Sequence, residues 1–228
     1  SCAHGIERWR NNCGCNTGAH SGWHQAWRAP LRDAMDWLRD STIKIYEDKM
    51  SQYIKDPWQA RDEYISIILN RSSENIESFF TKHSLKELAY EEKIKVLKLL
   101  EMQRHAMLMY TSCGWYFDDI SGIEAVQVMQ YAARAMQLAT EVAGVDLEPE
   151  YIRLLERAPS NIPKFKNGAN IYETFVKPEV LDLMRVGAHY AIFSLFGEYP
   201  ENPKALGDMS FYCYRAKSED YERLMMGR

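Results

Sequence analysis

The sequence lacks the features that mark several large classes of protein. No apolar run reaches the ~18 residues of a membrane-spanning helix, and no charged-then-apolar signal segment opens the chain. Its 28 Lys and Arg residues are outnumbered by 32 Asp and Glu residues, and no basic stripe offers a footprint for nucleic acid. We therefore expect neither a nucleic acid nor a membrane as partner.

Signatures of common catalytic sites are also absent. The sequence contains no glycine-rich phosphate loop, no GxSxG and no HExxH motif. Because no residues form a complete catalytic set, we assign no catalytic residue. Cysteine is scarce, and the odd count of five argues against a full disulfide framework and for a reducing, cytoplasmic compartment.

Helix signals dominate the rest of the chain, and no internal repeat is present. Apolar residues recur at helical spacing between proline, glycine and capping residues, which predicts helices over 30–54, 58–69, 72–80, 90–110, 122–143, 149–157 and 180–196. Only residues 209–215 read as a strand. The 11 methionines are expected mostly to fill the core.

These patterns predict an all-α fold, a bundle of about six to eight helices. We expect an irregular N-terminal segment over 1–28, a helical domain over 29–207 and the start of a truncated β region over 208–228.

Residues 1–28 have the most unusual composition. They hold three of the five cysteines, three of the six histidines and three of the six tryptophans, yet no apolar period runs through them. A segment so rich in reactive and aromatic side chains, without a core-forming pattern, is typical of a functional site.

Four potential metal ligands lie within this segment: Cys2, His4, Cys13 and Cys15. Thiolates and imidazoles bind zinc tetrahedrally, although the spacing here departs from the usual C-x2-C pattern. Three interpretations are open at this point: a zinc site, a disulfide among the three cysteines, or reduced and buried thiols.

The tryptophans of the segment suggest a second kind of site. The segment combines three tryptophans with planar polar groups, a mixture that suits a sugar or a purine. The tryptophans are Trp9, Trp23 and Trp27, and their neighbours are Arg8, Arg10, Arg28 and several Asn and Gln residues. Alternatively, these tryptophans cap one end of the bundle.

Aromatic residues and carboxylates also meet at the turn over 111–124. One interpretation is a substrate-facing rim, with Trp115 as a stacking surface and Asp118, Asp119 and Glu124 as polar contacts. The alternative is that carboxylates are simply favoured near a helix N-terminus. We expect this turn and residues 1–28 to be neighbours that line one concave face, on which five side chains converge: His4, Arg8, Trp9, Trp115 and Asp118.

A further polar pair lies on the predicted helix over 90–110. Glu101 and His105 are four residues apart and therefore share a face of that helix. We expect this face to be solvated.

Several of these segments resemble a known family. They are similar to the C-terminal region of bacterial glycoside hydrolase family 57 proteins, in which a domain of unknown function follows the catalytic barrel. The resemblance covers essentially the whole chain and is carried by 1–9, 13–15, 23–32, 110–124 and 211–221.

The resemblance implies a parent enzyme of carbohydrate metabolism that acts with retention on α-glucans or related α-linked sugars, and whose catalytic carboxylates lie on the barrel. This chain would be a non-catalytic domain that completes the substrate cleft, with the loop around His4, Arg8 and Trp9 facing it. Its partners would be an α-glycan or oligosaccharide and the N-terminal catalytic barrel of the same polypeptide. We expect no cofactor other than zinc at the four potential ligands. Two alternatives are a helical protein-interaction module and a metal-stabilised structural domain.

Overall fold

The computed structural model describes residues 2–180 and residue 185, and this part of the chain is all-α. It contains eight α-helices, and within the described residues the only β-type pairing is two isolated bridges, between Ile54 and Ser84 and between Pro159 and Asn167. The predicted helical bundle is therefore confirmed. No helix in these residues is both long and apolar enough to cross a membrane.

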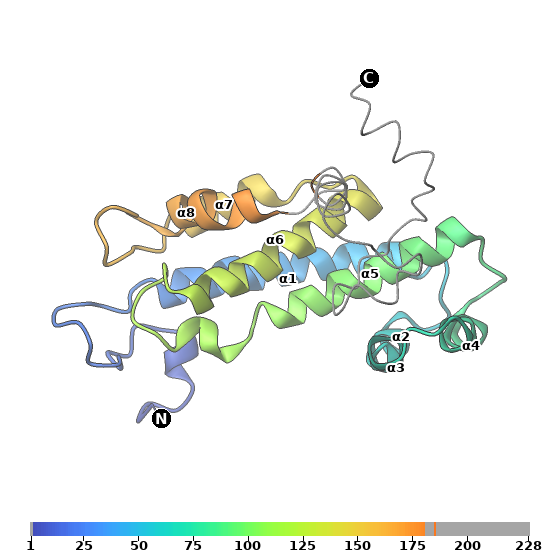
Figure 1. Cartoon of the computed structure of the whole chain (residues 1–228), viewed down its shortest axis with the longest axis horizontal. Coiled ribbons are helices and arrows are strands. Elements are labelled where there is room, and N and C mark those ends of the chain that lie inside the picture. The colour runs from blue at the N-terminus through green and yellow to red at the C-terminus, as the bar shows by residue number, and fades with distance from the viewer. Residues whose placement is uncertain (1, 181–184, 186–228) are drawn as a thin grey trace, which may run out of the picture. The chain divides into compact units, whose positions relative to one another are not determined.

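Three long helices form the centre of the bundle: α1 (Arg28–Met50), α5 (Tyr90–Leu108) and α6 (Ile123–Ala143). Helix α5 packs against both α6 and α1, which also contact each other, and α7 (Glu148–Leu155) packs on α1 (Figure 1). The chain then continues through α8 (Gly168–Ile171), the π-helical η3 (Tyr172–Val176) and the 3-10 helix η4 (Lys177–Glu179).

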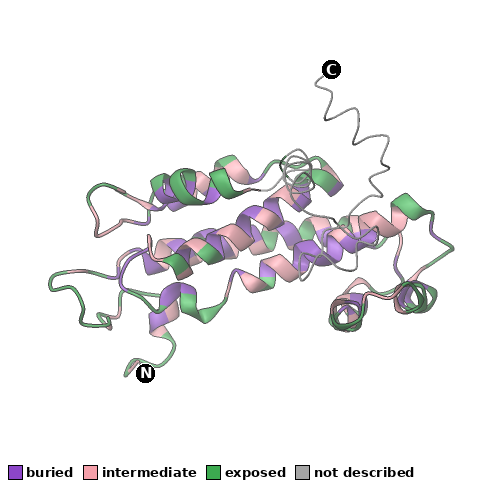
Figure 2. Cartoon of the chain, in the orientation of Figure 1, coloured by how far each residue is buried: buried purple, intermediate pink, exposed green. Residues whose placement is uncertain are grey.

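The buried side chains lie on the faces that the long helices turn toward one another (Figure 2). Methionine contributes to this core as expected, because six methionines are at most 3% exposed: Met35, Met50, Met102, Met109, Met129 and Met136.

Local signals explain where several helices begin and end. The carboxylate of Asp56 accepts from the backbone N–H groups of Trp58 and Gln59, and so caps α2 (Pro57–Glu63). The hydroxyl of Ser72 likewise caps α4 (Ser73–His83). Helix α6 ends at Gly144, whose φ of +68° is a left-handed conformation that suits glycine.

The structure differs from the sequence prediction at three places. The first helix ends at Met50 rather than near residue 54, because the following residues turn to pair with 83–85. The predicted helix over 58–69 is broken at Tyr64 into α2 and α3 (Ile65–Leu69). The helical stretch over 168–179 was not predicted. The predicted helix over 180–196, the strand over 209–215 and the boundary at 207/208 fall outside the described residues.

One end of the bundle brings together three irregular segments (Figure 1). These are the N-terminal segment (residues 2–27, including the 3-10 helix η1, Glu7–Trp9), the α5–α6 turn (residues 109–122, including η2, Ser112–Trp115) and the α7–α8 loop (residues 156–167). The residues that the sequence singles out, apart from Glu101 and His105, lie at this end.

Candidate functional site

Arg28, the first residue of α1, joins the N-terminal segment to the α5–α6 turn. Its guanidinium donates to the carbonyl of Cys15 at 3.0 Å and to the carbonyls of Tyr116 and Phe117 at 3.5 and 3.4 Å. The side chain is fully buried, and burial lowers the pKa of this guanidinium, which nevertheless stays cationic. The start of α1 thus supplies a buried positive charge beneath both segments.

Asp118 makes a second connection between the same two segments. Its Oδ1 accepts from the backbone N–H of Thr17 at 2.8 Å, and its Oδ2 accepts from the Thr17 hydroxyl. The indole N–H of Trp27 donates to the backbone carbonyl of Asp118 at 3.3 Å. The predicted proximity of the N-terminal segment and the α5–α6 turn is therefore confirmed.

Asp119 connects the α5–α6 turn to the α7–α8 loop. Its Oδ1 accepts from the backbone N–H and side-chain amide of Asn161 at 2.6 and 3.2 Å. Its Oδ2 accepts from the N–H and hydroxyl of Ser121 at 3.0 and 2.7 Å, and from the Ser160 hydroxyl at 2.9 Å. The buried Asp119 carboxylate therefore holds the α7–α8 loop against the α5–α6 turn.

Three predicted ligand-binding side chains serve packing instead. Trp115 is 1% exposed, its indole N–H donates to the Arg28 carbonyl at 3.3 Å, and its ring lies parallel to that of Tyr110. The prediction that it offers a stacking face to a ligand is therefore wrong. Arg8 is buried with its guanidinium 4.6 Å from the centre of the Tyr116 ring. Trp9 packs on the core and donates to the Ser112 carbonyl at 3.0 Å.

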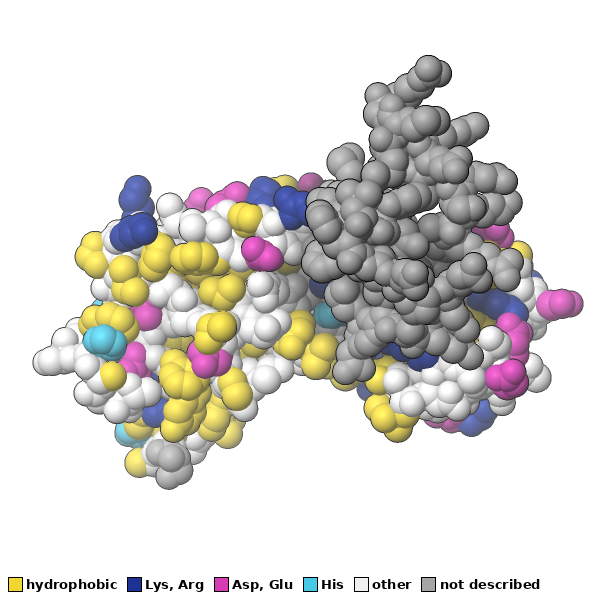
Figure 3. All heavy atoms as spheres, viewed as in Figure 1, with side chains coloured by type: hydrophobic (Ala, Val, Ile, Leu, Met, Phe, Trp, Pro, Cys, Tyr) yellow, Lys and Arg dark blue, Asp and Glu magenta, His cyan; other side chains and the backbone are white. Residues whose placement is uncertain are grey.

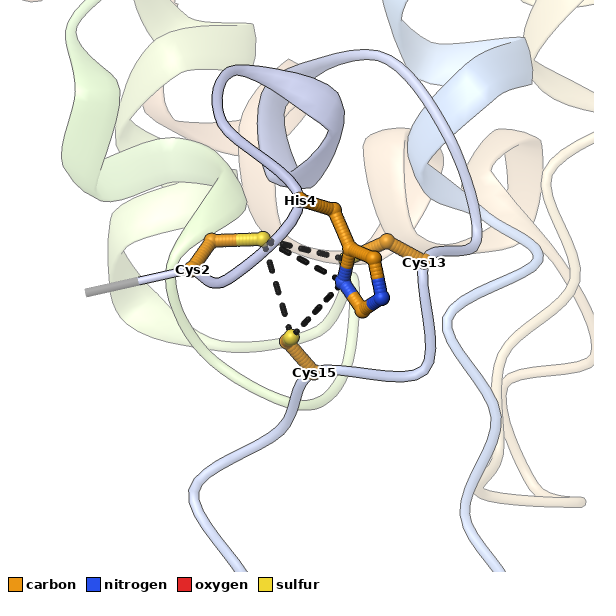
Figure 4. A group of neighbouring side chains, drawn as sticks. All are labelled: Cys2, His4, Cys13 and Cys15. Atoms are coloured by element: carbon orange, nitrogen blue, oxygen red, sulfur yellow. Dashed lines mark hydrogen bonds between the residues drawn. The ribbon is translucent and has the colours of Figure 1, made fainter.

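The four potential metal ligands converge at the N-terminal end of the chain (Figure 4). We call this group the Cys/His cluster: Cys2, His4, Cys13 and Cys15. Its ligand atoms all lie within 4.8 Å of one another. The Cys2 sulfur is 3.7 and 3.6 Å from the Cys13 and Cys15 sulfurs, so these cysteines are free thiols and form no disulfide. Nδ1 of His4 lies 3.8 Å from the Cys2 sulfur and 3.4 Å from the Cys15 sulfur.

Two thiols of the Cys/His cluster, Cys2 and Cys15, have shifted pKa values. Partial burial raises the pKa of Cys2, but hydrogen bonds from the backbone and side chain of His4 and from the other two thiols outweigh it and lower the pKa to about 6. The hydrogen bond with Cys2, followed by burial, raises the pKa of Cys15. Between Cys13 and Cys15 the chain turns at Gly14, whose φ of +78° is left-handed. A glycine at this position lets two neighbouring sulfurs face the same point.

A hollow of about 300 Å³ lies between the N-terminal segment and the α5–α6 turn. Its wall includes Trp23, which stacks on His20 with ring centres 3.8 Å apart. Its remaining lining is mixed polar and apolar: Thr17, Ala19, Phe117, Asp118, Asp119, Ser121, Gly122, Glu124 and Ile162. Figure 3 shows hydrophobic and histidine side chains gathered at the end of the molecule that carries the N-terminal segment.

The predicted site residues therefore divide into three groups. His4 joins the cysteines of the Cys/His cluster, whereas Trp23, Asp118, Asp119 and Glu124 line the hollow. The remaining predicted residues do not line the hollow, because Arg8 and Trp115 are buried and Trp9 packs on the core. The expected convergence of five side chains on one concave face is therefore wrong: of His4, Arg8, Trp9, Trp115 and Asp118, only Asp118 lines the hollow.

Sequence reasoning missed several residues that build this end of the bundle. Asn161 donates to the carbonyls of His24 and Asp118, and its own side-chain oxygen accepts from the His24 N–H. His20 and Phe117 line the hollow. The sequence could have indicated His20, which lies close to Trp23, and Phe117, which follows Tyr116 in an aromatic pair. No local sequence pattern links Asn161 to the N-terminal segment or to the α5–α6 turn.

The polar pair on α5, Glu101 and His105, does not line the hollow. The prediction that this pair lies on a solvated face is wrong. Glu101 is buried and accepts from the Tyr64 hydroxyl at 2.6 Å and from Arg104 at 3.1 Å. Burial raises the pKa of Glu101, but these bonds outweigh it and lower the pKa overall. Burial lowers the pKa of His105 to about 4. This pair is part of a polar cluster inside the bundle.

The fold and the site together define a helical domain with a Cys/His cluster at one end. Over residues 23–228 the chain matches the family described as Domain of unknown function (DUF3536), and it belongs to this family. Neither a curated protein nor a solved structure matches the chain. The Cys/His cluster precedes the matched range.

Proposed function

We propose that this chain is a non-catalytic helical domain of a glycoside hydrolase family 57-like enzyme, and that its hollow contributes to the binding of an α-linked glycan. The observation that carries this proposal is the lining of the hollow, which combines the stacked rings of His20 and Trp23 with the half-buried Glu124. Sugars bind where an aromatic face adjoins hydrogen-bonding groups. The two segments that line the hollow also carry much of the resemblance to that glycosidase family.

The hydrogen bonding of the two aspartates argues against a catalytic role for either of them. Both oxygens of Asp118 and both oxygens of Asp119 accept hydrogen bonds from protein donors. A retaining glycosidase needs a nucleophile and an acid, with the two carboxyl groups about 5–5.5 Å apart and free to reach the substrate. We therefore assign the chemistry to the catalytic barrel of the same polypeptide.

Calorimetric titration of the chain with linear α-glucan oligosaccharides tests this proposal. We expect Trp23→Ala to weaken binding by about tenfold, which corresponds to ~1.4 kcal/mol, because it removes the aromatic wall of the hollow. Tyr90→Ala is the matched control, since Tyr90 is an exposed aromatic residue at the start of α5 and outside the hollow. Equal affinity in both variants, or no binding by the wild-type chain, would contradict the proposal. We expect no hydrolysis of the oligosaccharides by the chain alone.

A second candidate function is docking to the catalytic barrel, which is favoured by exposed apolar residues near the same end. Ile123, at the start of α6, is 78% exposed, and Tyr116 and Phe117 are 43% and 40% exposed. Exposed apolar patches of this kind mark protein interfaces. Ile123→Ser should weaken association with the separately produced barrel, whereas Leu69→Ser, at a position 79% exposed on α3, should not.

A further inference from the structure

We propose that the Cys/His cluster binds one zinc ion in a tetrahedral site with three sulfur ligands and one nitrogen ligand. The ion would fasten the N-terminal segment to the end of the bundle. This site is independent of the glycan-binding role proposed above.

The spacing of the ligand atoms matches such a site. Zinc binds thiolate sulfur at about 2.3 Å and imidazole nitrogen at about 2.0–2.1 Å, so a regular tetrahedron has sulfur–sulfur edges of about 3.8 Å and sulfur–nitrogen edges of about 3.6 Å. The sulfur–sulfur distances from Cys2 are 3.6 and 3.7 Å, and the distances from Nδ1 of His4 to sulfur are 3.4 and 3.8 Å. Four of the six distances between ligand atoms thus lie within about 0.2 Å of those in a regular zinc tetrahedron, and all six are at most 4.8 Å (Figure 4).

The identity of the ligands selects the metal. Thiolates and imidazole in a tetrahedral arrangement favour zinc over calcium, magnesium or manganese, which prefer oxygen ligands in higher coordination. Four protein ligands also leave no open position for water or substrate. A site of this type holds a structure together and does not catalyse a reaction.

A buried positive charge lies next to the Cys/His cluster and would stabilise the negative charge of the zinc-bound site. Three thiolates and one divalent zinc ion carry a net charge of −1. Arg28 places its Nη1 3.8 Å from the Cys13 sulfur and 3.0 Å from the Cys15 carbonyl, and its side chain is fully buried. A donor that contacts a metal ligand in this way orients the ligand and stabilises its charge.

The N-terminal segment also needs such a crosslink. Most of it, from residue 2 to residue 24, is at least partly exposed, and only Arg8 within this stretch is buried. A segment without a core of its own gains its order from side-chain contacts and crosslinks. Zinc would join the two ends of the loop over 2–15 and place that loop against Arg28.

Metal analysis of the whole chain tests this inference. The protein would be produced without a histidine tag in zinc-supplemented medium, purified under reducing conditions and analysed by mass spectrometry for metals. We expect about one zinc per chain in the wild type and less than about a fifth of that in the single variants Cys13→Ser, Cys15→Ser and His4→Asn. Zinc removal by a chelator should lower the melting temperature by about 5 °C or more.

Matched controls separate the cluster from other thiols and imidazoles. Cys113 is an exposed free thiol, and His24 lies in the same N-terminal segment outside the cluster, so Cys113→Ser and His24→Asn should keep the full zinc content. Cobalt reconstitution of the wild type does not depend on the folding of any variant. It should produce the visible d–d and thiolate charge-transfer absorption of tetrahedral cobalt with sulfur ligands.

Three results would overturn the inference. One is a wild-type protein that folds and takes up no zinc or cobalt. Another is zinc that remains at full occupancy in the cluster variants. The third is a thiol titration of the reduced-purified wild type that finds two of the three cluster sulfurs joined in a disulfide.

Discussion

The position of Asp119 gives a prediction that separates a structural carboxylate from a ligand-binding one. Asp119→Asn keeps the size of the side chain but replaces one acceptor oxygen by an NH2 group. The two carboxylate oxygens accept from five donors, of which two are the backbone N–H groups of Ser121 and Asn161 on different oxygens. In either orientation of the new amide, at least one backbone N–H faces another donor.

The magnitude of the loss follows from these contacts. A hydrogen bond to a charged group contributes about 1.5–3 kcal/mol, and an unsatisfied buried donor costs about 1–3 kcal/mol. Because the serine hydroxyls can rotate to donate elsewhere, we expect a loss of about 2–4 kcal/mol in the free energy of unfolding. For a domain of this size the melting temperature should fall by about 5–15 °C.

Urea unfolding followed by circular dichroism measures this loss directly. Glu124→Gln is the matched control, because Glu124 lines the same hollow but is only half-buried, and it should change stability by less than about 0.5 kcal/mol. If Asp119→Asn is as stable as the control, the reasoning that treats Asp119 as an anchor of the α7–α8 loop is refuted.

Three further predictions concern the bundle. In Gly114→Ala the added Cβ would lie 2.8 Å from both Cγ atoms of Val128, so we expect a loss of about 1–3 kcal/mol in urea unfolding, partly recovered when Val128→Ala is added. The Tyr46 hydroxyl donates to the Pro57 carbonyl at 2.6 Å, and Tyr46→Phe should cost about 1 kcal/mol by the same measurement. Burial lowers the pKa of His105 to about 4, so the folded state favours the neutral ring and stability is full above the unfolded pKa. As the pH falls from about 6.5 to 4 the free energy of unfolding should drop by up to about 3 kcal/mol from this group, and His105→Gln should show a smaller drop in pH-dependent urea titrations.

The long helices were predictable because each combines a sustained apolar period with local end signals. Gly144 marks the end of the long helix α6, and among the shorter helices Asp56 followed by Pro57 marks the start of α2. The helical stretch over 168–179 was harder to predict because it is short and has no single helical geometry. It passes from α-helix to π-helix to 3-10 helix. Its capping residue, Asn167, accepts from the Asn170 N–H at 3.1 Å and was the only local signal available.

The candidate site was predictable in its location but not in the roles of its residues. Composition indicated the N-terminal segment and the α5–α6 turn, and the structure places these two segments together. Whether an aromatic ring in a non-periodic turn faces solvent depends on its tertiary partners. The burial of Trp115 depends on the backbone of Arg28 and the ring of Tyr110, which no local pattern reveals. The burial of Glu101 was unpredictable for the same reason. Its carboxylate accepts from the hydroxyl of Tyr64, which lies at the end of another helix and far away in sequence.

Within the described part of the chain, only a few side chains at this end of the bundle are free to bind a ligand, because many of the others attach the N-terminal segment to the bundle. Much of the unusual composition of the N-terminal segment is used to attach it: Trp9 and Trp27 donate to backbone carbonyls of the α5–α6 turn, and Arg8 packs on Tyr116. The N-terminal segment lacks an apolar period, so it is attached to the bundle by individual aromatic and charged side chains. Its excess of such residues therefore reflects this attachment in part, and not only ligand binding. After these contacts are accounted for, the groups left to meet a ligand in the hollow are the stacked His20–Trp23 pair and the half-buried Glu124. A functional test of this domain should therefore vary these side chains first.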